Sequence, residues 1–215
     1  MKNPLILVFA LLILTACGQR QSENQKAEEF DVGMGELQIS PESMNEIIQN
    51  IASPMEVAAQ INAMNVPYST QYLSDTESLS SGTSSFEMAY SLGALNANLG
   101  YLNIYEKTGA AVNFLSSINL LADALQIGQF FDYETIKRLA TSGSDLDSLM
   151  FISVNSFNNM ECHLRETDRS NLSSLMIAGV WIESLYLSTQ VAKQNSNEEL
   201  NAMIGEQKLI LNDLL

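Results

Sequence analysis

The chain has 215 residues, 46% hydrophobic and 16% charged, which is enough apolar material for one domain with its own core. Ten basic residues face 25 acidic ones, and no lysine or arginine lies between residues 27 and 106. The formal net charge of −15 argues against nucleic-acid binding, which needs basic side chains to neutralise phosphates, and against polybasic docking on anionic lipid. An acidic surface favours solubility, and it could also receive a basic partner or calcium.

Residues 1–17 have the pattern of a secretory signal. Lys2 is followed by an apolar run from Pro4 to Leu14, too short to span a bilayer, and then by small residues. The sequence Leu14-Thr15-Ala16-Cys17 resembles the lipobox of bacterial lipoproteins, in which the cysteine is lipidated and becomes the new N-terminus. The alternative is a plain signal peptide with a chance cysteine.

This resemblance implies a signal peptide at residues 1–16, a diacylglyceryl group and an amide-linked acyl chain on Cys17, and the membrane as a partner. Several acyl chains hold a protein stably on a bilayer, whereas one does not. Gly18 after the cysteine is not the aspartate linked to inner-membrane retention in enteric bacteria, so the outer membrane is favoured. Whether the protein faces the periplasm or the cell surface stays open.

Residues 17–38 are polar and glycine-dotted, so we expect a disordered tether that carries the lipidated Cys17. Residues 39–215 are expected to form a single helical domain. With Cys17 lipidated, Cys162 has no partner for an intramolecular disulfide and is most simply a buried small apolar residue. Ser40-Pro41 and Ser53-Pro54 each predict a helix start, because serine caps a helix and proline suits its first position.

The serine-rich residues 74–85 predict a loop, and residues 86–107 the first long helix. That helix carries two apolar stripes, so we expect it to be covered on two sides. One stripe contains small residues, of which Gly93 and Gly100 are expected to let a neighbouring backbone approach closely, since glycine in a helix needs compensation. The other stripe comprises Met88, Leu92, Leu95, Leu99 and Leu102.

A second long helix is predicted over residues 110–127, antiparallel to the first because the connection is short, with Gly128 as its C-terminal cap. Asp132 caps a short helix through Leu139. Ser144 precedes a further helix over residues 146–164. Its predicted core seam is Leu146, Met150, Ser153, Phe157, Met160 and Leu164.

Residues 171–193 again have two apolar sides, which favours a buried core helix over a membrane span, since Ser173, Ser174, Glu183 and Ser184 interrupt the stretch. Ser196 opens a final helix. No stretch shows strand alternation, so the predicted class is all-α, about eight helices in an irregular antiparallel bundle or stacked helical hairpins.

The sequence contains no recognisable catalytic constellation, so we expect no enzyme, no metal site and no cofactor. His163, the single histidine, neighbours Cys162, and adjacent helical positions diverge too far to share one centre. Asp145 and Asp147 suit the first turn of a helix better than a calcium loop.

Asp123 and Glu183 interrupt apolar helical runs, and a buried carboxylate needs an arginine, a lysine, a tyrosine or a ligand. A structural partner is one possibility for each, and a ligand site is the other. If Glu183 serves a ligand, the predicted pocket lies between the central helices and also contains Trp181 and Tyr186.

Several stretches also resemble an uncharacterised family of all-helical lipoproteins from Gram-negative bacteria, over most of residues 40–192. They are Ser53-Pro54-Met55-Glu56, Leu99-Gly100-Tyr101, Ile127-Gly128-Gln129-Phe130 and Gly179-Val180-Trp181-Ile182-Glu183-Ser184-Leu185-Tyr186. The resemblance implies no activity and no functional residues. The expected function is that of a lipid-anchored, non-enzymatic interaction or accessory module among envelope proteins. The alternative is a small-molecule binding protein.

Overall fold

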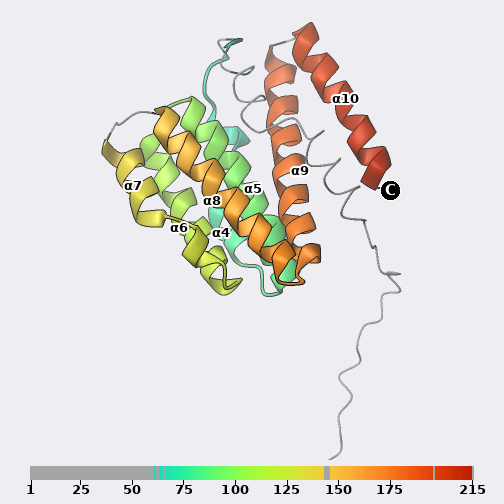
Figure 1. Ribbon diagram of the computed structural model, residues 1–215. Coiled ribbons are helices and arrows are strands. Elements are labelled where there is room, and N and C mark those ends of the chain that lie inside the picture. Colours follow the sequence, from blue (N-terminus) through green and yellow to red (C-terminus); the bar gives the residue numbers. More distant parts are fainter. Residues whose placement is uncertain (1–60, 62, 65, 143–145, 196, 215) are drawn as a thin grey trace, which may run out of the picture. The chain divides into compact units, whose positions relative to one another are not determined.

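The computed structural model describes residues 61, 63–64, 66–142, 146–195 and 197–214, all of which belong to one compact unit, Ile39–Leu215 (Figure 1). Within these ranges every regular element is a helix, so the predicted all-α class is confirmed. Several predicted features lie outside the described residues. They are the signal peptide, Cys17, the tether, the start of the helical domain, both serine-proline helix starts, Ser144 and Ser196.

Seven α-helices and two short 3-10 helices occupy the described part of the chain. In order they are η1 (Thr70–Tyr72), α4 (Thr76–Ser80), α5 (Ser85–Ile104), α6 (Thr108–Ala124), η2 (Gly128–Phe130), α7 (Tyr133–Ser142), α8 (Leu146–Glu166), α9 (Ser170–Gln194) and α10 (Glu198–Leu214). The serine-rich residues 74–85 were expected to be a loop, but they contain α4. Asp75 makes that helix possible, because its carboxylate accepts a hydrogen bond from the backbone N–H of Ser78.

Helix α5 is the centre of the fold and contacts α4, α6, α8 and α9. Its closest neighbour is α9, which lies beside it in Figure 1. A Cβ atom at Gly93 would overlap the carbonyl oxygen of Met176, and one at Gly179 would overlap that of Tyr90. These two glycines therefore allow the backbones of α5 and α9 to touch, as the small-residue stripe predicted for Gly93.

Gly100 does not share that role. A Cβ atom there would meet no atom within 4 Å, so the predicted close contact at Gly100 is wrong. The stripe extends over more turns than the backbone contact does.

Two groups of buried side chains fill the interior. The larger spans α5, α6, α8 and the first half of α9, and includes Leu92, Leu95, Leu99, Leu115, Ile118, Leu121, Met160 and Met176. The smaller lies towards the second half of α9 and comprises Ile61, Val66, Tyr72, Tyr101, Leu187, Val191 and Leu200. In α8 the buried set includes Leu149 rather than the predicted Met150, whereas Ser153, Met160 and Leu164 are buried as predicted.

Three helices end with a residue other than glycine in the left-handed conformation. Glu106, Gln126 and Asp168 have φ angles of 54°, 60° and 58°. After each, a backbone N–H bonds back five residues: Lys107 to Leu102, Ile127 to Ala122 and Arg169 to Leu164. This is the Schellman arrangement, in which glycine is the usual residue. The predicted cap at Gly128 is therefore wrong, because Gln126 ends α6 and Gly128 begins η2.

Other helix ends agree with the predictions in part. Asp132 accepts a hydrogen bond from the Thr135 N–H, as expected of a cap, although α7 continues to Ser142. At the start of α10 the Asn197 side chain accepts from the backbone of Glu199 and Leu200. Among the described helices, α9 is long and apolar enough to cross a membrane, and 56% of its most apolar window is buried inside the fold.

Candidate functional site

Glu183 lies in the middle of α9 with 8% of its surface exposed. Its Oε1 atom accepts a 2.6 Å hydrogen bond from the Ser74 hydroxyl and a 2.8 Å bond from the Asn98 Nδ2 atom. The Ser74 backbone N–H donates to the Asn98 Oδ1 atom at 3.1 Å, which closes a three-membered network. These two partners of the carboxylate are neutral side chains, whereas the sequence analysis expected an arginine, a lysine, a tyrosine or a ligand.

This network joins three parts of the chain: the segment before α4, the middle of α5 and the middle of α9. A carboxylate strengthens hydrogen bonds from neutral donors, so it fixes both side chains more firmly than a neutral acceptor would. Burial raises the pKa of the nearby Tyr90 hydroxyl, and the negative charge of Glu183 raises it further. The two hydrogen bonds accepted by Glu183 link the segment before α4, α5 and α9, which supports a structural role.

Trp181 lies on another side of α9. Its indole N–H donates to the Gln207 side chain at 2.8 Å, which fastens α10 to α9. A narrow groove between these helices is lined by Trp181, Ser184, Leu185, Ser188, Met203, Ile204 and Gln207. The cavity within it has a volume of about 10 Å³, room for about one water molecule.

The structure does not bring the three predicted pocket residues together. Glu183 faces α5, Trp181 faces α10, and Tyr186 is 41% exposed. Spacing separates Trp181 from the other two residues, because positions two and five residues apart point to different sides of a helix. Glu183 and Tyr186 are three residues apart and differ instead in exposure, 8% against 41%. Ligand binding at these residues remains a prediction, and a ligand that contacts Glu183 Oε1 would compete with Ser74 and Asn98.

The other candidate residues are also separate from one another. Asp123 is exposed and accepts a hydrogen bond from Asn119, so it is not a buried carboxylate. Cys162 is only partly buried, so the prediction of a buried residue is wrong, and its thiol donates to Glu166. This bond, the partial burial and the adjoining negative charge raise the pKa of the thiol. The His163 ring instead packs on Phe130, with centroids 4.5 Å apart. No group of three histidine, cysteine or acidic side chains within the described ranges could hold a metal ion.

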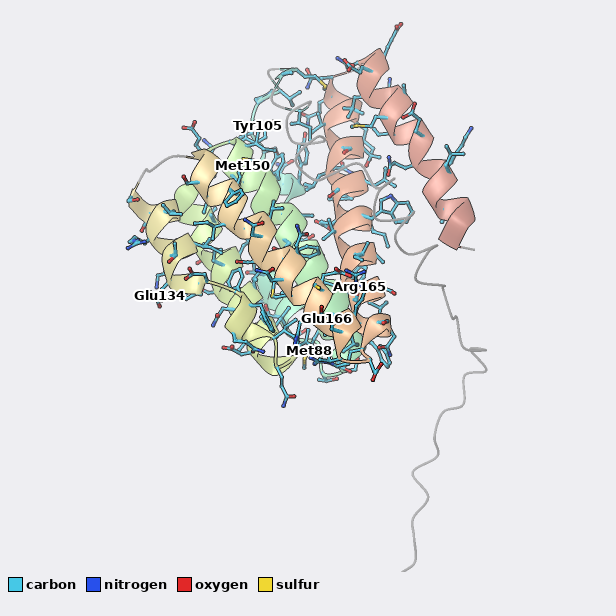
Figure 2. All side chains as sticks on the ribbon, in the orientation of Figure 1. Met88, Tyr105, Glu134, Met150, Arg165 and Glu166 are labelled. Atoms are coloured by element: carbon cyan, nitrogen blue, oxygen red, sulfur yellow. The ribbon has the colours of Figure 1, made fainter. Side chains whose placement is uncertain are left out.

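One surface feature was not predicted. Phe151 and Val154 on α8 are 68% and 40% exposed. They lie within residues 148–160, where no charged residue occurs. Figure 2 shows the charged residues Arg165 and Glu166 at the far end of the same helix. The signal was present in the sequence, because Phe151 falls outside the predicted seam of α8 and is too large for an ordinary exposed position.

Comparison of the chain with protein-family models, curated proteins and solved structures finds no match.

Proposed function

We propose that this chain is a lipid-anchored envelope lipoprotein whose helical domain binds another envelope protein and carries out no catalysis itself. The observation that carries the proposal is Leu14-Thr15-Ala16-Cys17 directly after a short apolar run. Such an anchor places the protein on a membrane, and Gly18 favours the outer membrane of a Gram-negative cell. After cleavage, nine basic residues would face 25 acidic ones, a net charge of −16.

The charge and the exposed face of α8 together indicate the kind of partner. Like charges across an interface are costly, so a strongly acidic protein associates most readily through a surface without charge. Residues 148–160 provide such a surface, with Phe151 as its most exposed apolar side chain. Aromatic side chains are frequent anchors of protein interfaces. We therefore propose a protein partner that offers an apolar contact surface without excess negative charge.

Crosslinking in intact envelopes tests this proposal. The full chain is crosslinked in its native membrane, purified and analysed for proteins that co-purify in stoichiometric amounts. We expect one such protein with the parent chain and its loss from both Phe151→Asp and Cys17→Ser. Two different variants are needed because the first alters the surface and the second alters only the attachment.

Asn201→Asp is the matched control, since it adds the same charge to an exposed position on α10, outside residues 148–160, and removes no apolar side chain. Retained binding in this control, with loss in Phe151→Asp, assigns the contact to the uncharged surface of α8 around Phe151. A parent chain that captures no protein in stoichiometric amount would contradict the proposed function.

A further inference from the structure

The exposed face of α8 is a continuous strip along the helix, which we call the α8 strip. Phe151, Asn155, Asn158 and Cys162 follow one another at spacings of four, three and four residues, so they lie on one side of the helix, and Val154 flanks them. Cys162 is partly buried, and the other four residues are exposed. The α8 strip is about 16 Å long and contains no acidic or basic residue.

Charged residues stand at the two ends of the α8 strip. Asp147 belongs to the first turn of α8 and Arg165 to its last turn. The eighteen residues from 147 to 165 make five full turns, so these two positions fall on the same flank of the helix. The Arg165 side chain is 39% exposed and contacts Glu161 of the same helix at 2.7 Å. This flank of α8 is therefore acidic at its start and basic at its end.

This order of charges fits a second copy of α8 that runs in the opposite direction. If two copies pair about a two-fold axis at the level of Ser156, Asp147 of each copy is level with Arg165 of the other, because both positions are nine residues from Ser156. In a parallel pair, Asp147 would instead face Asp147, and Arg165 would face Arg165. Like charges opposed across an interface are costly, so the charges favour the antiparallel pair.

The same pairing also matches the uncharged residues of the α8 strip. Asn155 and Asn158 lie within one turn of the axis, and a side-chain amide can both donate a hydrogen bond to its own copy and accept one from it. Farther from the axis, Phe151 is nearly level with Cys162 of the second copy. Sulfur next to an aromatic ring is a favourable contact. The α8 strip is therefore complementary to itself when antiparallel.

Net charge restricts where two copies could meet. A chain with a formal net charge of −15 repels its own copies, so self-association is least unfavourable through a surface without excess negative charge. A contact between one pair of helices is small beside the roughly 1,200–2,000 Å² of a stable interface. Attachment to a membrane, which holds copies at a high local concentration, would offset that small area.

We propose that the α8 strip binds the α8 strip of a second copy of this chain, antiparallel about a two-fold axis at Ser156, and that the lipoprotein is a dimer on its membrane. This inference rests on the proposed function, because it uses the same face of α8. It goes further by naming the partner and the direction in which the two helices run.

Disulfide crosslinking in intact envelopes tests the proposal. Asn155→Cys is introduced into the full chain together with Cys162→Ser, and the envelopes are oxidised with copper phenanthroline. In the proposed dimer the two residues 155 are about 3 Å apart along the helix axes, whereas the two residues 162 are about 18 Å apart. We expect a dimer joined through residue 155, identified by mass spectrometry of the linked peptide, and no dimer of the parent chain joined through Cys162.

Asn201→Cys with Cys162→Ser is the matched control, because Asn201 is exposed on α10 rather than on α8. It should give at least about tenfold less dimer than Asn155→Cys. Equal yields from the two variants, or a parent dimer joined through Cys162, would overturn the proposal.

The products at residue 155 separate this inference from the proposed function. A disulfide between residue 155 and a different protein overturns the second copy as partner and leaves the proposed function standing. No product at residue 155 also overturns the second copy. The proposed function is then decided separately, by whether the crosslinked parent chain captures any protein in stoichiometric amount.

Discussion

Gly93 and Gly100 lie on the same stripe of α5, yet only one of them is needed for packing. A side chain at Gly93 would collide with the backbone of α9, whereas a side chain at Gly100 would meet nothing within 4 Å. The sequence shows a repeated spacing of small residues, but the repeat does not reveal where two helices diverge. Helices cross at an angle, so close contact is confined to a short stretch around the crossing point.

Gly93→Ala should lower the free energy of unfolding by about 1–3 kcal/mol, because the atoms in its way belong to the backbone of α9 and cannot rotate aside. Gly100→Ala should raise it by up to about 1 kcal/mol through the better helix propensity of alanine. Urea unfolding followed by circular dichroism measures both. Equal effects of the two substitutions would contradict a crossing of α5 and α9 at Gly93.

The sequence predicts that Glu183 is buried among apolar residues, but not that Ser74 and Asn98 bind it. Ser74 is 109 residues away along the chain, and no local pattern links the two positions. Within a serine-rich segment, the sequence does not distinguish the serine that bonds to a distant residue from its neighbours. Only the structure shows that neutral donors from two segments bind Glu183, rather than the arginine, lysine, tyrosine or ligand expected from the sequence.

Glu183→Gln should change the free energy of unfolding by less than about 1 kcal/mol, because its amide oxygen can accept both hydrogen bonds and the burial of a charge is relieved. Glu183→Leu should cost at least about 2 kcal/mol, since it leaves the Ser74 hydroxyl and the Asn98 amide without this acceptor. Denaturant unfolding compares the two. A Gln variant as unstable as the Leu variant would show that the charge itself is essential.

Ionisation of Tyr105 makes stability depend on alkaline pH. Its pKa is raised from 10.0 to about 12 in the folded chain. Between these values the unfolded chain loses the proton and the folded chain keeps it, so stability is full below pH 10 and falls as pH rises towards 12. Tm measured against pH should decline over this interval. In Tyr105→Phe the decline of Tm should be shallower. A pH profile of Tm identical to that of the parent chain would contradict ionisation of Tyr105 as the cause.

At the scale of the helices, most of the fold could be predicted from the sequence. The periodicity of apolar residues locates α5, α6, α8 and α9, because a helix in a packed bundle must bury the same face over several turns. The ends were harder to predict. α4 was missed because five residues are too few for a periodic pattern, and the C-terminus of α6 was misplaced because glycine is the usual signal for it.

The end of α6 suggests a stabilising substitution. Gln126 has a φ angle of 60°, a conformation that strains a side chain but not glycine. We expect Gln126→Gly to raise the free energy of unfolding by about 0.5–1 kcal/mol, and Tm gives the measurement. Ala124→Gly is the matched control, since that exposed residue is the last of the helix proper and glycine should destabilise it. Two variants of equal stability would argue against strain at Gln126.

At the scale of the whole molecule, charge and attachment act together. A protein with a formal net charge of −15 gains little from electrostatic attraction to an anionic membrane. The membrane attachment that we propose would therefore depend on the lipid on Cys17 rather than on the charge of the helical domain.

Cys17→Ser should move the protein from the membrane fraction to the soluble fraction, because serine cannot receive a thioether-linked lipid. Fractionation of cells followed by immunoblotting measures the change, and thermal unfolding of the released chain checks that its domain is intact. A variant that remains in the membrane fraction would contradict lipidation at Cys17.

The hydrogen bonds at Ser69 and Ser74 have a mechanical consequence. Residues 66–75 are fastened to Tyr101 and Asn98 of α5 and to Glu183 of α9 before the chain reaches α4. Tension that reaches Ser69 from the N-terminal side of the chain therefore passes to these bonds, and through them to the closely packed pair of α5 and α9, before it reaches α4. The load is shared between several bonds, so α4 and α6 are shielded from a pull until the first bonds break.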